Sequence, residues 1–321
     1  MSNDSPTLAV PELREVAMHA HRPNDPGTAV ITKSEVCTAS KKAAGFVRHI
    51  EFDVTGSALE GICAAGQSVG VLAPGEDAKG RPYAPRLYSL ACPTGGEDGE
   101  GKILSTTVKR TIDEHWDDHS LFRGVCSNYL CDAQVGDEIR VTGPAGKRFV
   151  LPKNPGDHGY VFVATGTGIA PFRGMCLELL RDHPGTLITL MMGAPYASDL
   201  LYHDFFEGLA KEHTNFRYVT ALSRQPNDDG SGPLYIGDRF RKNDGALVEQ
   251  LSDEKTLIYV CGIAGMELGI LSSMVFELGE EISEPFVTVD DDIRHPSVRW
   301  DRKMMHKKIK TTKRVFLEVY A

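Results

Sequence analysis

The spacing of apolar residues changes its character once along this chain, between residues 152 and 159. Before that point, short apolar runs alternate with Gly, Pro, Asp and Asn, which is the pattern of an antiparallel barrel or sandwich. After it, continuous apolar runs alternate with stretches of helical spacing, as in βαβ units around a parallel sheet. Because one core does not accommodate both patterns, the 321 residues are expected to form two domains of different class.

The predicted organisation is an irregular arm over residues 1–25, an antiparallel β-barrel over 26–155 and an α/β domain with a parallel sheet over 156–321. The expected barrel strands are residues 27–38, 46–54, 67–74, 86–92, 102–111 and 137–146. The second domain has expected strands at 160–165, 187–194, 216–223 and 257–262 and expected helices at 171–183, 201–213 and 264–280. A last strand is predicted by the period-two alternation of Val315, Leu317 and Val319 with Phe316, Glu318 and Tyr320.

The composition argues against several partners and locations. A formal net charge of −9 disfavours nucleic acid, and no apolar run reaches the roughly 18 residues that a membrane span needs. Seven scattered cysteines do not form a disulfide framework, and the N-terminal residues do not resemble a secretory signal, so a cytoplasmic location is expected. Residues 301–314 are basic and form either a solvated helix face or a docking patch for an acidic partner.

Two segments have the composition of phosphate-binding turns. Residues 163–174 place Gly166 and Gly168 between a strand and a helix, where the N–H groups of a helix N-terminus bind phosphate. A tight connection with no ligand has the same composition. Ser223 and Arg224 follow another strand and suit a phosphate monoester such as the 2′-phosphate of NADP, although a surface turn explains them equally well.

Three further segments are ambiguous when each is taken alone. In the stretch "RLYS", Tyr88 and Ser89 lie on opposite faces of a strand, and Arg86 offers a guanidinium group to a diphosphate. Residues 123–130 resemble a loop that enters a helix. Cys261 ends a buried strand, at the edge of a parallel sheet where ligands bind. An ordinary strand, loop or buried cysteine would explain each of them without any function.

The order of these motifs is more specific than any one of them. The stretches "RLYS", "GVCSNYL", "TGTGIAPFR", "SR", "CGIAGM" and "EVY" follow one another as in the plant-type ferredoxin–NADP reductase family, which the chain resembles from about residue 28 onward. The resemblance implies a FAD-binding antiparallel β-barrel followed by an NADP-binding α/β domain. It also implies a reductase that passes hydride between NADP(H) and FAD and exchanges electrons with ferredoxin or flavodoxin, which are acidic electron-transfer proteins.

The family's motifs carry functional residues onto positions of this chain. The implied catalytic residues, around the reacting atoms, are Ser89, Cys261, Glu318 and Tyr320. The implied flavin-binding residues are Arg86, Leu87, Tyr88, Ser89, Val125, Cys126 and Ser127, and Lys109 matches a residue that reaches the dinucleotide diphosphate. The implied NADP-binding residues are Thr165, Thr167, Ala194, Pro195, Ser223, Arg224 and Tyr235, and Thr107, Gly262 and Ile263 are further cofactor-binding residues. The resemblance implies no metal ligand.

The tyrosine near the end of the chain is expected to act as a gate. In the family this tyrosine lies against the isoalloxazine ring of the flavin, and Tyr320 matches it, with Tyr88 on the other face of the ring. Offset aromatic stacking contributes about 0.5–1.5 kcal/mol beyond burial, and nicotinamide must displace Tyr320 to reach the flavin. Ala321 follows the tyrosine, where the family usually ends, and is expected to change the affinity for nicotinamide.

Two departures from the family bear on the nucleotides. Pro233 stands where plant members carry a lysine that helps to bind the 2′-phosphate, so discrimination against NAD depends on whether Arg239 or Arg241 compensates. The aromatic residue that stacks on the adenine of FAD is also not obvious, and Trp116 and His115 both remain candidates.

The identity of the electron partner is the least transferable inference, because residues 290–308 do not follow the plant pattern. The first hypothesis is a ferredoxin–NADP reductase. An alternative enzyme with the same flavin core is the NAD(P)H-dependent reductase component of an oxygenase system. A non-enzyme alternative is a flavin-fold protein that binds a dinucleotide only as a sensor.

Overall fold

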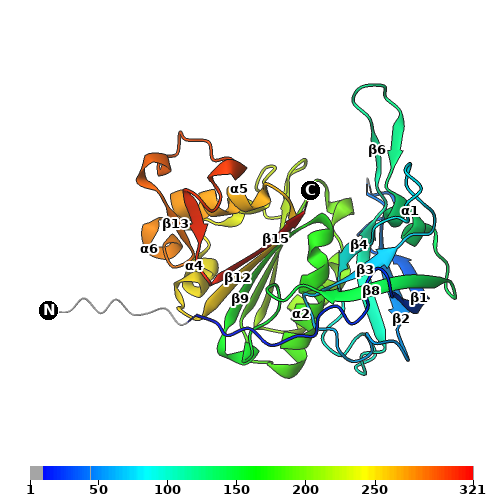
Figure 1. The fold of residues 1–321 in the computed structure, drawn as a ribbon. Coiled ribbons are helices and arrows are strands. Elements are labelled where there is room, and N and C mark those ends of the chain that lie inside the picture. The colour runs from blue at the N-terminus through cyan, green and yellow to red at the C-terminus, as the bar shows by residue number, and fades with distance from the viewer. Residues whose placement is uncertain (1–9, 44, 321) are drawn as a thin grey trace.

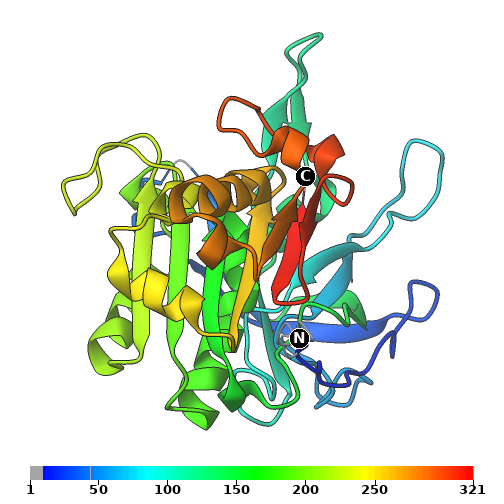
Figure 2. The same cartoon turned by 90° about the vertical axis from the view of Figure 1, so that its left-hand side faces the viewer.

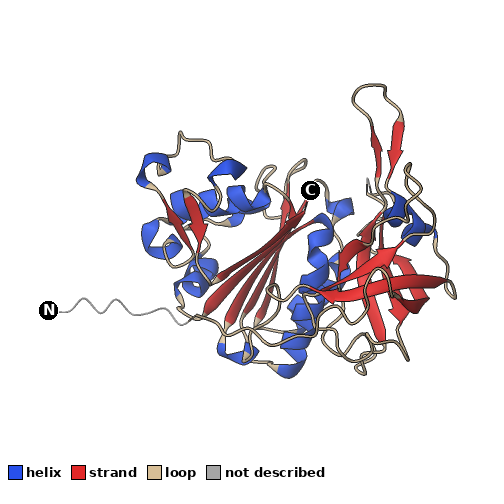
Figure 3. Cartoon of the chain, in the orientation of Figure 1, coloured by secondary structure: helices blue, strands red, loops and turns tan. Residues whose placement is uncertain are grey.

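A computed structural model describes residues 10–43 and 45–320 of the protein. It contains two large sheets of different kinds, which lie next to each other with a helix between them (Figures 1 and 3). The start of the predicted arm, residues 1–9, and Ala321 lie outside the described residues. The two-domain class is confirmed, whereas the predicted boundaries at residues 25 and 155 stay predictions.

The N-terminal sheet is antiparallel and has six strands. These are β1 (Gly27–Val36), β2 (Val47–Asp53), β3 (Ser68–Leu72), β4 (Arg86–Ser89), β5 (Ile103–Lys109) and β8 (Glu138–Ala145), in the order β4-β3-β8-β1-β2-β5. The two outer strands meet just beyond the end of β4, where Leu90 bridges Thr106 and the Ala91 N–H donates to the Ser105 carbonyl at 2.8 Å. This contact closes the sheet into the predicted barrel.

The second sheet has five strands, and all neighbouring pairs are parallel (Figure 2). In spatial order they are β11 (Phe216–Leu222), β10 (Ile188–Ala194), β9 (Gly159–Thr165), β12 (Thr256–Ile263) and β15 (Val315–Tyr320). Helices α2 (Ile169–Asp182) and α3 (His203–Glu212) pack on one face, and α4 (Gly245–Ser252) and α5 (Met266–Ser273) pack on the other. The predicted α/β architecture is therefore confirmed.

Every run predicted as a strand forms one, but several elements were not predicted. Two hairpins were not predicted, namely β6 (Ile112–Glu114) with β7 (Leu121–Arg123) and β13 (Val287–Val289) with β14 (Ile309–Thr311). Helix α4 was not predicted either. For α1 (Val125–Asp132), only the loop that enters the helix was predicted. The helix expected over 264–280 is divided: α5 continues as a π-helical turn, Met274–Leu278, and α6 (Glu280–Ser283) follows. Gly279, at a φ of 86°, separates the two because this conformation does not continue a helix.

An apolar cluster runs across both sheets. Phe149, which follows β8, packs against Phe172 on α2 and Tyr259 on β12, with ring centroids 5.9 and 5.4 Å apart. All three side chains are buried. The barrel and the parallel sheet therefore share one hydrophobic contact rather than being joined only by a linker.

The described part of the N-terminal arm, from residue 10 onward, lies along both parts of the molecule (Figure 1). Leu13 forms an isolated bridge with Pro152, and His21 forms another with Gly143. The Lys153 N–H donates to the carbonyl of Glu12 at 2.8 Å. Over residues 10–26 the chain has bridges, turns and bends but no helix.

The seven cysteines all carry free thiols, and six of them are buried. Burial raises the pKa of each thiol above its ordinary value. The prediction that they form no disulfide framework is confirmed.

Helix α2 lies directly on the backbone that follows β4. A Cβ atom added to Gly174, in the middle of this helix, would lie 2.1 Å from the Cys92 carbonyl oxygen. Real Cβ atoms do not approach an oxygen so closely, and the clashing atom is backbone that cannot turn away. Gly208, within α3, has open space at the same position.

These two helical glycines form a matched pair for a stability measurement. Gly174→Ala is expected to lower the free energy of unfolding by about 1–3 kcal/mol or more, because the added methyl group overpacks the contact with Cys92. Gly208→Ala is expected to raise it by about 0.5–1 kcal/mol, since alanine is the better helix former. Urea titration of both variants checks this, and equal effects would contradict the close contact.

Candidate active site

The carboxyl ends of the parallel strands bring together most of the residues predicted to bind NADP. Because all five strands run in the same direction, their ends meet at one edge of the sheet. The residues at or just after these ends are Thr165 and Thr167 after β9, Ala194 and Pro195 after β10, Ser223 and Arg224 after β11, Cys261, Gly262 and Ile263 on β12, and Glu318 and Tyr320 on β15. The sequence motifs, which are far apart along the chain, thus converge in space.

The Gly-rich turn after β9 joins two of these strand ends. The hydroxyl groups of Thr167 and Tyr320 share a hydrogen bond of 2.7 Å. A Cβ atom on Gly168 would lie 2.1 Å from the Cys261 carbonyl oxygen, so only glycine allows the turn to lie against the end of β12. Thr165 accepts a hydrogen bond of 3.2 Å from the Ile263 N–H, which fixes the same two segments from the other side.

A pocket of about 570 Å³ opens at this edge of the sheet. Six predicted residues line it: Thr165, Ala194, Pro195, Ser223, Tyr235 and Ile263. The prediction missed further lining residues from two segments, namely Leu234, Ile236, Met266, Gly269, Ser272 and Ser273. Met266, Gly269 and Ser273 are spaced by three and four residues on α5, so helical periodicity applied to "CGIAGMELGILSS" would have placed them on one face.

The end of β11 is fixed to the end of β10 by backbone hydrogen bonds. The Ser223 N–H donates to the Ala194 carbonyl and the Arg224 N–H donates to the Pro195 carbonyl, each at 3.0 Å. These bonds hold the Ser223 hydroxyl at the wall of the pocket and leave Arg224 exposed beside it. Tyr235, which lines the pocket as well, is 75% exposed.

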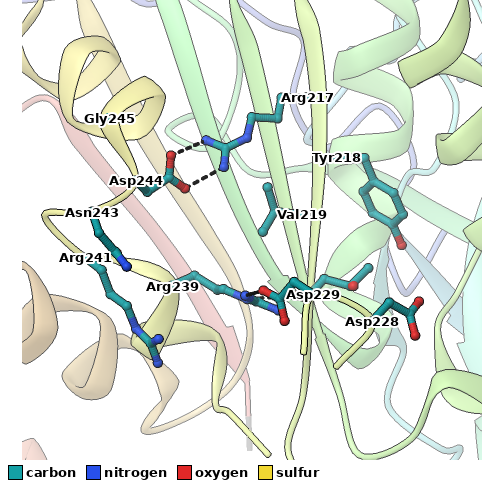
Figure 4. Close-up of a pocket in the computed structure, with 11 residues that line it drawn as sticks. Arg217, Tyr218, Val219, Asp228, Asp229, Arg239, Arg241, Asn243, Asp244 and Gly245 are labelled. Carbon is teal, nitrogen blue, oxygen red and sulfur yellow. Dashed lines mark hydrogen bonds and ion pairs between the residues drawn. The ribbon is translucent and has the colours of Figure 1, made fainter. Parts of the chain in front are cut away.

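The two arginines proposed to replace the missing lysine lie elsewhere. Arg239 pairs with Asp229 and also donates to the Thr220 carbonyl at 2.9 Å, so its guanidinium is already bound. Arg241 lines a different pocket, at the outer edge of the sheet, where Arg217 pairs with Asp244 (Figure 4). Neither residue lines the pocket of Ser223, so they do not fill the place that Pro233 leaves.

The predicted flavin-binding residues form a second group, at the closing edge of the barrel. Arg86, Leu87, Tyr88 and Ser89 make up β4, and Val125, Cys126 and Ser127 make up the first turn of α1. The thiol of Cys126 donates to the carbonyl of Val71, the strand partner of Arg86. The Thr111 N–H donates to the Ser127 hydroxyl at 3.2 Å, which ties the helix to the end of β5, where Lys109 is exposed.

This group has the surface that a large, partly apolar anion requires. Leu87 is 62% exposed and Val125 is 45% exposed, although both are apolar and lie beside a packed core. Helix α1 has no side-chain cap at its N-terminus, so its first N–H groups are available to a phosphate. The residues present therefore fit a flavin with a diphosphate.

One predicted residue is not brought to this group. Thr107 on β5 is buried, and its hydroxyl shares a hydrogen bond of 2.6 Å with the hydroxyl of Tyr202, near the start of α3. The side chain therefore faces the contact between barrel and parallel sheet. Position in a motif did not reveal this, because the direction of a side chain on a barrel strand depends on register.

Cys261 and Glu318 lie side by side, as partners in the register of β12 and β15. Cys261 is buried, and burial together with the nearby Glu318 raises the pKa of its thiol. Burial also raises the pKa of the Glu318 carboxyl to about 7. A carboxyl group with a pKa near neutrality takes up and releases protons at physiological pH, as a proton-transfer group must.

The hairpin β6–β7 projects from the barrel (Figure 1). Trp116, at its tip, is 96% exposed, whereas His115 packs edge-on against Phe122 at 5.7 Å. An indole group so fully exposed has no partner within the described chain, and it is the larger flat surface that the hairpin offers.

Comparison with known proteins gives this arrangement its context. Residues 162–271 match the model of the oxidoreductase NAD-binding domain family. A ferredoxin–NADP reductase of Spirulina is 34% identical over 272 residues, covering 83% of this chain and 91% of the relative. The chain belongs to the ferredoxin–NADP reductase family. A chloroplastic leaf isozyme of this family from rice, Oryza sativa subsp. indica, is 37% identical over 266 residues, covering 81% of this chain and 72% of the relative.

Solved structures of the family share the fold. The ferredoxin–NADP+ reductase from Plasmodium falciparum superposes with a TM-score of 0.68 at 20% identity, covering 94% of this chain and 98% of that one. A structure of the same enzyme with 2′P-AMP superposes with a TM-score of 0.65, covering 80% of this chain and 95% of that one. At this identity the likeness establishes the two-domain architecture.

The basic stretch 301–314 is not a helix face. It forms a 3₁₀ turn, Arg302–Met304, and strand β14. Its exposed cations include Lys303, Lys307, Lys310 and Lys313, whereas Lys308 pairs with Asp292 and Arg302 lies 3.6 Å from Glu267.

Among residues 10–43 and 45–320, no helix has the length and apolar character to cross a membrane.

The raised pKa of Glu318 makes a prediction about stability. The folded protein holds this proton up to about pH 7, whereas the unfolded chain releases it near the ordinary value of 4.5. The free energy of unfolding therefore falls as the pH rises from about 4.5 to 7 and levels off above that, by at most about 3 kcal/mol. Glu318→Gln removes this component of the slope. Urea titrations at several pH values check it, and an unchanged slope in the variant would contradict the assignment.

Proposed function

We propose that the protein is a FAD-dependent ferredoxin–NADP reductase, which transfers electrons between NADP(H) and a one-electron partner. The observation that carries the proposal is the convergence of the family's motif residues at one edge of the parallel sheet, with Thr167 bonded to Tyr320 and Cys261 beside Glu318. Membership of the family supports the same activity. FAD supplies the chemistry that connects a two-electron hydride donor to a one-electron acceptor.

On this proposal, β4 and α1 hold FAD. Arg86 would pair with the diphosphate, the N–H groups of Cys126 and Ser127 would bind its oxygens, and Leu87 and Val125, which are exposed, would cover apolar parts of the cofactor. Tyr88 is half-buried and packs against the barrel core. It can therefore support a flavin ring from one side without moving.

The pocket at the strand ends binds the nucleotide. Thr165, Thr167, Ala194, Pro195, Gly262 and Ile263 line the path of NADP(H). Ser223, Arg224 and Tyr235 hold the adenosine end. Because Arg239 is already paired, recognition of the 2′-phosphate depends on Arg224 and the Ser223 and Tyr235 hydroxyl groups.

Tyr320 occupies the place that nicotinamide requires. Its ring is 42% exposed, and the bond from its hydroxyl to Thr167 holds it at the end of the Gly-rich turn. Nicotinamide binds only after this contact has broken, which lowers its affinity and eases its release. Ser89 and Cys261 would then contact the reacting rings from the two sheets, and Glu318, whose carboxyl pKa is raised to about 7, would exchange protons with solvent or orient the partner.

The electron partner is proposed to be ferredoxin, or flavodoxin in its place. The lysines at 303, 307, 310 and 313 form an exposed cationic surface on a chain whose net charge is −9. Such a surface attracts an acidic protein and raises its rate of association at low ionic strength. An oxygenase as acceptor is the alternative, and a comparison of partners tests it.

Trp116 is the proposed partner of the FAD adenine. Trp116→Leu is expected to weaken FAD binding by about 1 kcal/mol, or roughly fivefold, because the stacking surface is lost. His115→Leu serves as the matched control and should leave the affinity nearly unchanged, since its ring is already packed on Phe122. Calorimetric titration of the apoprotein with FAD measures both. A larger loss in the histidine variant would assign the adenine to His115.

The proposed function is tested by anaerobic titration of the purified protein, following the visible absorption of the flavin. NADPH is expected to bleach bound FAD rapidly, and NADH more slowly, with a smaller preference than a phosphate site containing an additional lysine would give. A protein that takes up no FAD, or whose FAD is reduced by neither nucleotide, would refute the reductase.

The second stage of this test identifies the partner. The reduced protein is mixed with ferredoxin, with flavodoxin and with an oxygenase component, and the rate of electron transfer to each is measured at two ionic strengths. Rapid, salt-sensitive reduction of ferredoxin is expected. Preference for the oxygenase component would favour the alternative function.

A further inference from the structure

Hydride transfer requires two rings to meet at about 3–3.5 Å, and an error of 1 Å costs about a hundredfold in rate. In this protein the two walls of the proposed site come from different sheets: Ser89 ends β4 of the barrel, and Cys261 lies on β12 of the parallel sheet. Something must therefore fix the barrel against the parallel sheet. This requirement rests on the proposed function, and one residue of α2 meets it.

Helix α2 contacts both walls. Its N-terminal end continues the Gly-rich turn, which lies against the Cys261 carbonyl and bonds to Tyr320 through Thr167. Its middle lies against residues 91–97, which begin two positions after Ser89. Because a helix is stiff along its axis, the position of α2 on residues 91–97 also sets the position of the turn.

Arg173 makes the central polar contact of this interface. Its Nη1 donates to Glu97 Oε1 at 2.5 Å and to the Ala91 carbonyl at 2.9 Å, and Nη2 donates to Glu97 Oε2 at 3.3 Å. The guanidinium lies over the rings of Tyr202 and Phe205, with centroids 5.6 and 5.4 Å away. Both charged side chains are largely buried, so the pair is weakly screened by solvent.

The carboxylate of Glu97 is held by the barrel itself. The Ser105 hydroxyl on β5 donates to Glu97 Oε1 at 2.6 Å, and β5 is the strand that receives Ala91 where the barrel closes. Glu97 also lies near His49 and Glu51, and the ligand atoms of these three residues lie within 4.8 Å of one another. Since Arg173 and Ser105 already donate to Glu97, we assign this cluster to charge pairing rather than to a metal ion.

A second contact of opposite charge lies further along the helix. Glu178 is buried, accepts the Thr94 N–H at 3.0 Å and pairs with Arg14 of the N-terminal arm at 2.6 Å. A cation and an anion on one helix thus bind the same short segment. Sliding α2 along residues 91–97 would break both contacts together, so the interface defines one position rather than a range.

We propose that Arg173 is a positioning residue for hydride transfer, which fixes α2 and its Gly-rich turn relative to Ser89 by binding Glu97 and the Ala91 carbonyl at once. It touches neither ring and acts through the backbone of two segments. Lysine cannot replace it fully, because an ammonium group lacks the fork that reaches both acceptors in this geometry.

The test uses the FAD-loaded protein and single-turnover reduction by NADPH. Arg173→Met is expected to slow flavin reduction by about 10- to 100-fold, while FAD stays bound and the dissociation constant of NADPH changes little. The long-wavelength absorption from contact between nicotinamide and flavin should weaken in parallel. Arg173→Lys should recover part of the rate. Arg181→Met, on the same helix but paired only with its neighbour Asp182, is the matched control and should behave as wild type.

If Arg173→Met is unstable, two further measurements test the same contact. Glu97→Gln retains the shape of the acceptor, and its effect should not add to that of Arg173→Lys in the double variant, because both act through one contact. Backbone hydrogen exchange in segments 91–97 and 169–176 should quicken in both single variants and not in Arg181→Met.

Each outcome has a distinct meaning. Reduction at the wild-type rate with unchanged contact absorption in Arg173→Met would overturn the positioning role while leaving the reductase intact. Additive losses in the double variant, or slow reduction explained wholly by lost FAD, would overturn it as well. A wild-type protein whose FAD is not reduced by NADPH would refute the proposed function itself.

Discussion

The absence of a side chain at position 174 is the constraint on which the geometry of the site depends. It lets α2 lie on the backbone of Cys92, and this close approach brings Arg173 and Glu178 within reach of the same segment. The barrel and the parallel sheet are thereby joined through backbone and buried charge as well as through the apolar contact of Phe149. A reaction between two rings held by two different sheets needs a junction of this kind, since a flexible linker would leave their separation undefined.

The other wall of the proposed site is formed by the carboxyl ends of the parallel strands. Parallel strands place their carboxyl ends at one edge of the sheet, wherever the strands occur in the chain. Thr165, Ser223 and Cys261 are therefore brought together by the sheet topology and not by local sequence. Gly168 and the bond from Thr167 to Tyr320 then set the details. The pocket of Ser223 has fewer cations than a strict phosphate site is expected to have, because Arg239 and Arg241 line a different pocket and Pro233 brings no cation.

The fold could be predicted because both repeating patterns are local. Period-two runs with turn residues identified the six barrel strands, and strand–helix alternation identified the parallel sheet. The hairpin of β6 and β7 was missed because each of its strands has only three residues and all of them are exposed, so neither strand shows an alternating pattern of burial. Arg173 and Glu97 could not have been paired from the sequence, since they are 76 residues apart and Glu97 lies in a loop outside any periodic pattern. Thr107 was predicted to bind a cofactor from its place in the motif alone. In the structure its hydroxyl shares a hydrogen bond with that of Tyr202, a contact that the motif does not indicate.

The protonation state of the cysteine thiols affects how readily the protein is oxidised by the products of its own reaction. Reduced flavins meet dioxygen, and peroxide oxidises cysteine through the thiolate rather than the thiol. Burial raises the pKa of Cys63 and Cys92 to about 12 and that of Cys131 to about 11, so almost no thiolate exists at neutral pH. Cys261, which lies at the proposed site of hydride transfer, is buried as well, and its thiol pKa is raised. The protein therefore presents little cysteine thiolate to the peroxide that a reduced flavin can generate.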